Sequence, residues 1–294
     1  MKDSTAESST ADLRDLRPFV GTMLRCGTMR VLMALLTVAI LGAAPVIAAD
    51  PLAEARRSYN LGEYDTARKY ASEALKVPST VESARLVLGR AHLELYRRSA
   101  DGEDLTAARE ALRAVNAELL DRRERVELTV GIGECLFLED KFGTAAEVFE
   151  PALDSSTILG PAAHERVLDW WATSLDRLAL SRARDAREPL YTRIIARMEK
   201  ELIEDPSSAP AAYWVAAARR GTGNLDRALA AAQAGWITAT HGRDRGAALR
   251  ADLDRLVIQG IIPEQAIKLQ PRDPKPLIAG MVAEWEALKA AWTK

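Results

Sequence analysis

The sequence predicts an all-α protein in which helix–turn–helix pairs stack into an α–α superhelix that ends in a C-terminal helical cap. The first observation is composition, because alanine and leucine dominate and arginine and glutamate fill the polar positions, all with high helix propensity. The second is periodicity, since apolar residues recur at three- and four-residue intervals through most of the chain. The third is repetition: Ala67, Ala108, Ala145 and Ala228 occupy matching positions, separated by 41, 37 and 83 residues. The last interval is about twice the others, and this near-regularity indicates a solenoid.

Composition and charge narrow the class of protein further. The chain has 294 residues, of which 48% are hydrophobic and 28% charged, which is enough to form a substantial core. Its net charge is −2, and its basic clusters are short and have acidic residues nearby. Nucleic-acid-binding proteins usually carry a basic surplus, so we expect no nucleic-acid partner. The two cysteines, Cys26 and Cys135, lie far apart, and the apolar neighbours of Cys135 predict a buried, unreactive side chain.

The first 49 residues differ in character from the rest. Residues 1–28 are polar and weakly patterned, and we interpret them as an extension upstream of a working start at Met29, with Met23 as the alternative start. Residues 29–49 combine Arg30, an apolar run from Val31 to Leu41, helix breaks and small residues, a pattern typical of a secretory signal peptide. An uncleaved inner-membrane anchor remains open, because the run is free of charge. Both interpretations predict an exported protein of the periplasm or cell envelope, which contacts a membrane only through an uncleaved leader.

The helix–turn–helix pattern is clearest between Gly133 and Leu153. Gly133 and Ala145 are small where two helices must approach, and Phe137, Phe142 and Phe149 are aromatic where the gap must be filled. Residues 126–138 and 142–153 are the expected helices.

The repeat domain is expected to span residues 50–240. It opens with Asp50 as an N-cap before a proline, and residues 51–78 and 210–236 repeat the pattern clearly. Glycine-containing turns join their helices at residues 60–63 and 221–224. Residues 81–115 and 167–202 repeat it weakly, the second with an arginine-rich turn at residues 182–188.

Residues 241–294 are expected to form the cap. An amphipathic helix near residues 249–257 precedes a proline-rich link and a last helix. The apolar face of this last helix is expected to include Trp285 and Trp292, and would cover the end of the stack.

In the spacing of small and aromatic residues, the segments between Asp50 and Trp236 resemble the tetratricopeptide repeat (TPR), a helix–turn–helix of about 34 residues. The resemblance implies a right-handed superhelix whose first helices line a groove for a protein or peptide partner. The two-lysine, two-asparagine arrangement with which some members hold a peptide carboxylate is not visible. The resemblance implies nine positions that face the groove. The match is weakest in the fourth repeat, which supplies Asp169 and Thr173. The nine positions are Arg56, Asn60, Arg90, Glu94, Glu134, Asp169, Thr173, Tyr213 and Arg220.

The sequence carries no recognisable catalytic or cofactor motif. His92, His164 and His241 lie far apart and have no acidic or cysteine neighbour at zinc-ligand spacing. A phosphate loop, a dinucleotide fingerprint and a nucleophile elbow are all missing. We therefore expect a non-enzymatic scaffold or adaptor of a bacterial cell envelope, with no cofactor and no metal. An enzyme that uses an unrecognised pair of carboxylates is another alternative.

The tryptophans leave a second function open, which is binding of a glycan or lipid-like small ligand. Aromatic residues at helical spacing usually belong to the core, so most are expected to be buried. Trp170 and Trp171 are neighbours and point about 100° apart, so the two cannot both face one interior. One of this pair is then a candidate for an exposed binding residue. The six tryptophans are Trp170, Trp171, Trp214, Trp236, Trp285 and Trp292.

Overall fold

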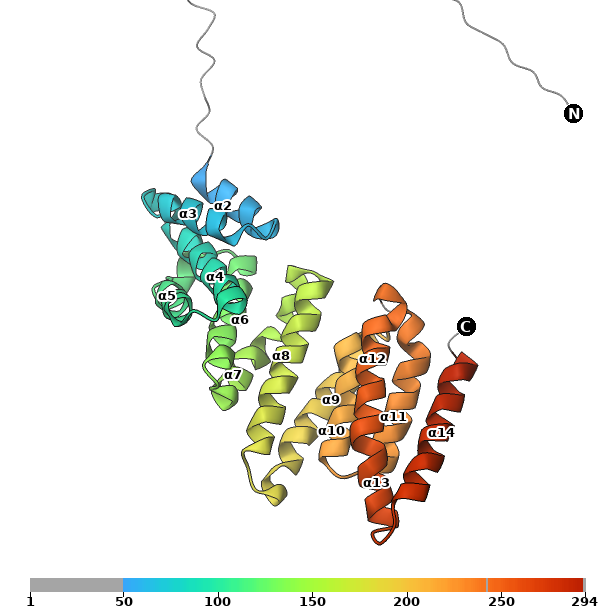
Figure 1. The fold of residues 1–294 in the computed structure, drawn as a ribbon. Coiled ribbons are helices and arrows are strands. Elements are labelled where there is room, and N and C mark those ends of the chain that lie inside the picture. The colour runs from blue at the N-terminus through green and yellow to red at the C-terminus, as the bar shows by residue number, and fades with distance from the viewer. Residues whose placement is uncertain (1–49, 242, 293–294) are drawn as a thin grey trace, which may run out of the picture. The chain divides into compact units, whose positions relative to one another are not determined.

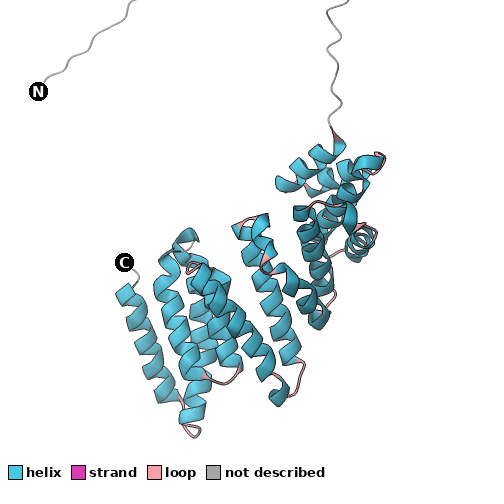
Figure 2. Ribbon diagram, turned by 180° about the vertical axis from the view of Figure 1, so that it is seen from behind, coloured by secondary structure: helices cyan, strands magenta, loops and turns pink. Residues whose placement is uncertain are grey.

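The computed structural model describes residues 50–241 and 243–292, which belong to one compact unit. All regular structure in this part of the chain is helical, so the predicted all-α class is confirmed (Figure 2). The extension at residues 1–28 and the signal peptide or anchor at residues 29–49 lie outside the described residues. None of the described helices is long and apolar enough to cross a membrane.

The helices follow one another in chain order, and each contacts the next (Figure 1). They form five consecutive pairs and a C-terminal group. The pairs are α2 (Pro51–Asn60) with α3 (Tyr64–Ala74), α4 (Val81–Ser99) with α5 (Gly102–Arg113), α6 (Arg122–Leu138) with α7 (Phe142–Phe149), α8 (Pro161–Leu180) with α9 (Glu188–Glu204), and α10 (Ala209–Gly221) with α11 (Leu225–Thr238). The C-terminal group is α12 (Ala247–Leu256), a π-helical turn (Val257–Ile261), α13 (Ile262–Leu269) and α14 (Lys275–Trp292).

The first helices of successive pairs also touch each other. Helix α2 contacts α4, α4 contacts α6, α6 contacts α8, α8 contacts α10, and α10 contacts α12. We call these six helices the first-helix row. The buried apolar clusters also follow chain order, from α2–α4 through α4–α6 and α7–α10 to α10–α14. Each helix therefore packs mainly against its near neighbours in sequence.

The third pair matches the expected helices except at its ends. Helix α6 begins at Arg122, earlier than expected, because Asp121 and Glu124 form a capping box. Helix α7 ends at Phe149, and a 3-10 turn, Glu150–Ala152, follows at the proline. Cys135 is 4% exposed, which confirms its predicted burial, and this burial raises the pKa of its thiol to about 12.

The predicted turns between helices are confirmed where glycine is required. Gly62 and Gly223 have φ angles of +77° and +78°, in the left-handed region that other residues rarely adopt.

The C-terminal helix α14 packs against the core through one apolar face, as expected, but this packed face ends before the predicted Trp292. Trp285 is 2% exposed, donates its Nε1–H to Asp254 Oδ1 at 2.8 Å, and packs edge-on against Trp236. The apolar contacts of α14 with the core end at Leu288. Trp292 is 55% exposed, so its placement on the buried face was wrong.

Candidate interaction surface

The nine residues expected to bind a partner all lie on the first-helix row, and the structure brings five of them into two hollows. Arg90, Glu94 and Glu134 line a hollow between α2, α4, α6 and α8. Tyr213 and Arg220 line a second, larger hollow formed by α8 to α13. The other four, Arg56, Asn60, Asp169 and Thr173, lie outside the lining of both hollows.

We call the first of these the Glu134 hollow. It has a volume of about 50 Å³ and is walled by charged and aromatic side chains from four successive first helices. Its apolar wall includes Val130, Leu159, Ala163 and Val167. The charged and aromatic lining residues are Tyr59, Arg90, Glu94, Glu127, Glu134, Arg166 and Trp170.

Glu134 lies deepest in this set and is 6% exposed. Its Oε1 atom is buried and has no hydrogen-bond partner among the described residues. Arg97 Nη2 lies 2.8 Å from Oε1, so the two groups form an ion pair that is misaligned for a hydrogen bond. Burial raises the pKa of Glu134 to about 7, although Arg97 opposes this shift. The carboxyl group therefore exchanges its proton near neutral pH.

Two arginines stack on the aromatic residues of the hollow. The guanidinium of Arg90 lies 4.4 Å from the centre of the Tyr59 ring, and its Nη1 donates to Glu127 Oε2 at 2.6 Å. The guanidinium of Arg97 lies 4.6 Å from the centre of the Trp170 ring and also contacts Glu94. These cation–π contacts connect α2 with α4 and α4 with α8.

The adjacent tryptophans have different environments, as their angular separation requires. Trp171 is fully buried and donates its Nε1–H to Glu150 Oε2 at 2.6 Å. Trp170 is half-buried and stacks on Phe149 within the hollow's wall. Trp170 is thus the member of the pair that reaches the surface.

The second hollow has a volume of about 1350 Å³ and an aromatic floor. Tyr191, Tyr213 and Trp214 line it, and the exposed side chains of Leu180 and Ile267 add apolar surface. Its polar groups are partly paired with each other. Arg220 contacts Glu264 at 2.6 Å, and the Tyr191 hydroxyl donates to Asp176 Oδ1 at 3.0 Å. Arg184 and Arg187, from the arginine-rich turn, also line it.

Two of the expected binding residues outside the hollows have intramolecular partners. Arg56 forms an ion pair with Glu124 at the start of α6. Asp169 accepts a hydrogen bond from Trp214 Nε1 at 2.8 Å. Asn60 is exposed at the end of α2, and Thr173 is half-buried on α8.

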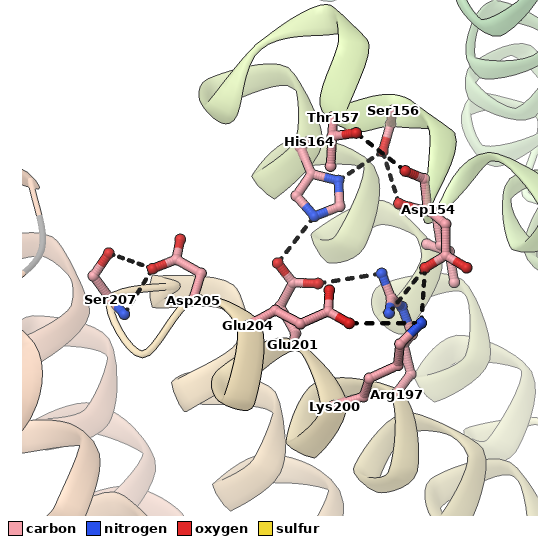
Figure 3. A network of polar contacts seen from close by, with 11 residues as sticks. Asp154, Ser156, Thr157, His164, Arg197, Lys200, Glu201, Glu204, Asp205 and Ser207 are labelled. Carbon is pink, nitrogen blue, oxygen red and sulfur yellow. Dashed lines mark hydrogen bonds and ion pairs between the residues drawn. The ribbon is translucent and has the colours of Figure 1, made fainter.

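A separate polar network surrounds His164 (Figure 3). It lies beside a cavity of about 570 Å³. His164 Nδ1 lies 2.7 Å from Ser156 Oγ, and Nε2 lies 2.9 Å from Glu201 Oε1. Arg197 Nη2 lies 3.2 Å from Glu201 Oε2, and its Nη1 lies 3.2 Å from Asp154 Oδ1. No pattern in the sequence predicts this network, because Ser156 and Glu201 lie 8 and 37 residues from His164.

The order hydroxyl, imidazole, carboxylate occurs in enzymes that activate a serine nucleophile. Here Ser156 is fully buried, and its Oγ also lies 3.1 Å from the carbonyl oxygen of Leu153. A buried hydroxyl cannot contact a substrate, so we interpret the network as a structural link between α8, α9 and the turn at residues 153–157. Within the described ranges, no group of three histidine, cysteine, aspartate or glutamate residues is placed to hold a metal ion.

No known family model matches the chain, and no curated protein matches it at a significant level. Function must therefore be inferred from the residues and their geometry.

Proposed function

We propose that this protein is a non-enzymatic interaction scaffold, a TPR-like superhelix that binds a segment of a protein partner along its first-helix row. The observation that carries the proposal is the Glu134 hollow, where charged and aromatic side chains from four successive first helices meet at the surface. Arginine, tyrosine and tryptophan are the residues that dominate binding energy at protein interfaces.

The dimensions of the two hollows favour a segment of protein chain over a compact ligand. The Glu134 hollow has room for the tip of one side chain, while the second hollow holds several residues. Both hollows include side chains of α8, and we propose that one extended segment enters both.

A small-ligand module is the alternative, and the second hollow is the observation that favours it. Its aromatic floor and volume suit a glycan or lipid-like molecule. Quenching of tryptophan fluorescence by envelope sugars or lipids, lost in Trp214→Phe, would support this alternative.

We also propose that the chain is exported, because residues 29–49 have the composition of a secretory leader. The scaffold would then work in the periplasm, or at the inner membrane if the leader is retained. Cell fractionation with antibody detection tests this, and a mature protein found only in the cytoplasm would contradict it.

Affinity capture from cross-linked envelope fractions tests the scaffold function. The row variant combines Arg166→Glu on α8 with Lys268→Glu on α13, beside the row, and both residues are exposed at the rims of the two hollows. The control variant combines Arg113→Glu and Arg227→Glu, exposed residues on the second helices α5 and α11. Both variants reverse two positive charges.

We expect a partner that is recovered with wild type and control and lost with the row variant, and that binds again as a purified protein. Equal recovery by all three proteins would contradict the first-helix row as the binding surface. Recovery of nothing by any of them would contradict protein binding and favour the small-ligand alternative.

A further inference from the structure

We propose that the second hollow receives a part of the bound segment in which a large apolar side chain lies beside acidic residues. This inference rests on the proposed function, because it specifies the chemistry of that segment.

The floor of the second hollow presents aromatic rings whose polar atoms are already bound within the chain. The Tyr191 hydroxyl donates to Asp176 Oδ1 at 3.0 Å, and Trp214 Nε1–H donates to Asp169 Oδ1 at 2.8 Å. An apolar side chain can cover these rings without separating a donor from its acceptor. The floor therefore favours an apolar occupant.

Two exposed apolar side chains line the same hollow. Leu180, the last residue of α8, and Ile267, on α13, are both 54% exposed. A single exposed apolar residue is common on protein surfaces, but two that share one hollow with an aromatic floor are typical of an interaction site. An apolar side chain of the partner would remove all of these groups from water together.

Half of the acidic residues that line the hollow are already bound. Asp176 accepts the hydrogen bond from Tyr191, and Glu264 accepts two from Arg220, at 3.1 Å from Nε and 2.6 Å from Nη2. The π-helical turn holds Arg220 in this position, because a Cβ atom at Gly260 would lie 2.7 Å from Arg220 Cζ. These acidic groups are therefore not available to a partner.

The remaining charges at the rim have a positive surplus. The lining side chains that have no ion-pair partner in the described part of the chain are Arg184, Asp185, Arg187, Glu188 and Lys268. Arg182 adds a further positive charge beside Arg187, whose Nε donates to the Arg182 carbonyl oxygen at 3.0 Å. Of the two acids, Glu188 is the first residue of α9, where the helix dipole offsets its charge. This surplus favours an acidic segment over a basic one.

The cations lie close in sequence to the two exposed apolar residues. Lys268 directly follows Ile267 on α13, and Arg184 lies four residues after Leu180, in the turn between α8 and α9. A segment whose apolar side chain contacts the floor would thus bring its neighbouring residues to these cations. Aspartate or glutamate at those neighbouring positions is the chemistry that the rim fits best.

The test selects 12-residue peptides from a display library on the purified full-length chain at low salt. The affinities of the selected peptides are then measured for wild type and for paired variants. The apolar variant combines Leu180→Ser and Ile267→Ser. Its control combines Leu119→Ser and Ile203→Ser, which are 71% and 82% exposed and lie outside the lining of this hollow.

A second pair of variants tests the charges. The charge variant combines Arg184→Glu and Lys268→Glu, and the earlier control with Arg113→Glu and Arg227→Glu reverses the same number of exposed positive charges on second helices. The peptides are also synthesised with asparagine for aspartate and glutamine for glutamate, which removes only the charge. Circular dichroism and thermal unfolding establish that each variant is folded.

We expect the apolar variant to bind the peptides about tenfold more weakly or worse, and its control less than about twofold more weakly. The charge variant should also lose about tenfold at low salt, and clearly less at about 0.5 M salt, because salt screens exposed charges. Neutralising the acidic residues of the peptides should weaken binding to wild type and should not weaken binding to the charge variant.

Two results would overturn the inference, and they differ in what they say about the scaffold. Peptides that bind the apolar variant as tightly as its control, or that bind wild type equally well after neutralisation, contradict the acidic and apolar site. They leave the scaffold intact when their affinity falls in Arg166→Glu, at the rim of the Glu134 hollow. Failure to select any peptide that loses affinity for the row variant contradicts the scaffold, and the inference with it.

Discussion

The ring of Phe149 lies directly against the backbone of Gly133. A Cβ atom at residue 133 would lie 2.5 Å from Phe149 Cε1, well inside van der Waals contact. Phe149 is fully buried, and its ring also stacks on Trp170. The close approach of α6 and α7 therefore depends on the absence of a side chain at Gly133.

Gly133→Ala is expected to lower the free energy of unfolding by about 2–3 kcal/mol, because the buried ring has no space into which to move. This loss should exceed the gain of up to about 1 kcal/mol that alanine usually brings to a helix. Urea denaturation measures the change. Gly143→Ala is the control, since its Cβ would meet Leu178 at an ordinary 3.5 Å, and it should be neutral or stabilising. A Gly133→Ala protein as stable as wild type would contradict the packing.

Glu134→Gln is expected to stabilise the protein increasingly as pH rises. The pKa of Glu134 is raised from 4.5 to about 7 in the folded protein by burial. Its favourable contribution is complete below the unfolded pKa and is lost as pH rises through the folded pKa. Glutamine does not titrate, so the stability of Glu134→Gln relative to wild type should grow between pH 4.5 and 7, by at most on the order of 3 kcal/mol.

Urea denaturation at pH 5 and pH 8 measures this difference, with the exposed Glu110→Gln as the matched variant. A difference between Glu134→Gln and wild type that is the same at both pH values would show that the carboxyl group is not desolvated.

The sequence predicts those parts of the fold that depend on local pattern. The helical periodicity, the glycine turns and the burial of Cys135 follow from residues close together in the chain. The sequence also predicts that a small residue of one helix faces an aromatic residue of the next, as Gly133 and Phe149 do, because such residues recur at helix–turn–helix spacing.

The composition of the Glu134 hollow could be predicted only in part. Arg90, Glu94 and Glu134 were expected on this surface, whereas the contributions of Arg97 and Arg166 were not predicted. The separate network around His164 was not predicted either. These contacts join helices up to two pairs apart, and they depend on the angle at which successive pairs pack. Sequence spacing carries no information on that angle.

Replacing the two tryptophans of α14 one at a time should change the free energy of unfolding by very different amounts. Trp285→Ala is expected to lower the free energy of unfolding by about 3–5 kcal/mol, because it empties a buried site and leaves Asp254 without its indole donor. Trp292→Ala should change it by less than about 0.5 kcal/mol, since Trp292 is more than half exposed. Thermal or urea unfolding of the two variants measures the contrast. Equal effects would contradict the position at which α14 leaves the core.

His164→Ala is expected to destabilise the fold by about 2–4 kcal/mol, because it leaves the buried groups of Ser156 and Glu201 without their common partner. His241→Ala, at an exposed histidine, is the control and should have little effect. Ser156→Ala should cost about 1 kcal/mol alone and add little to His164→Ala, since both changes break the same hydrogen bond. Urea denaturation of the two single variants and the double variant gives this coupling. Additive effects would mean that the two side chains do not interact, and an unchanged stability in His164→Ala would contradict the structural role of the network.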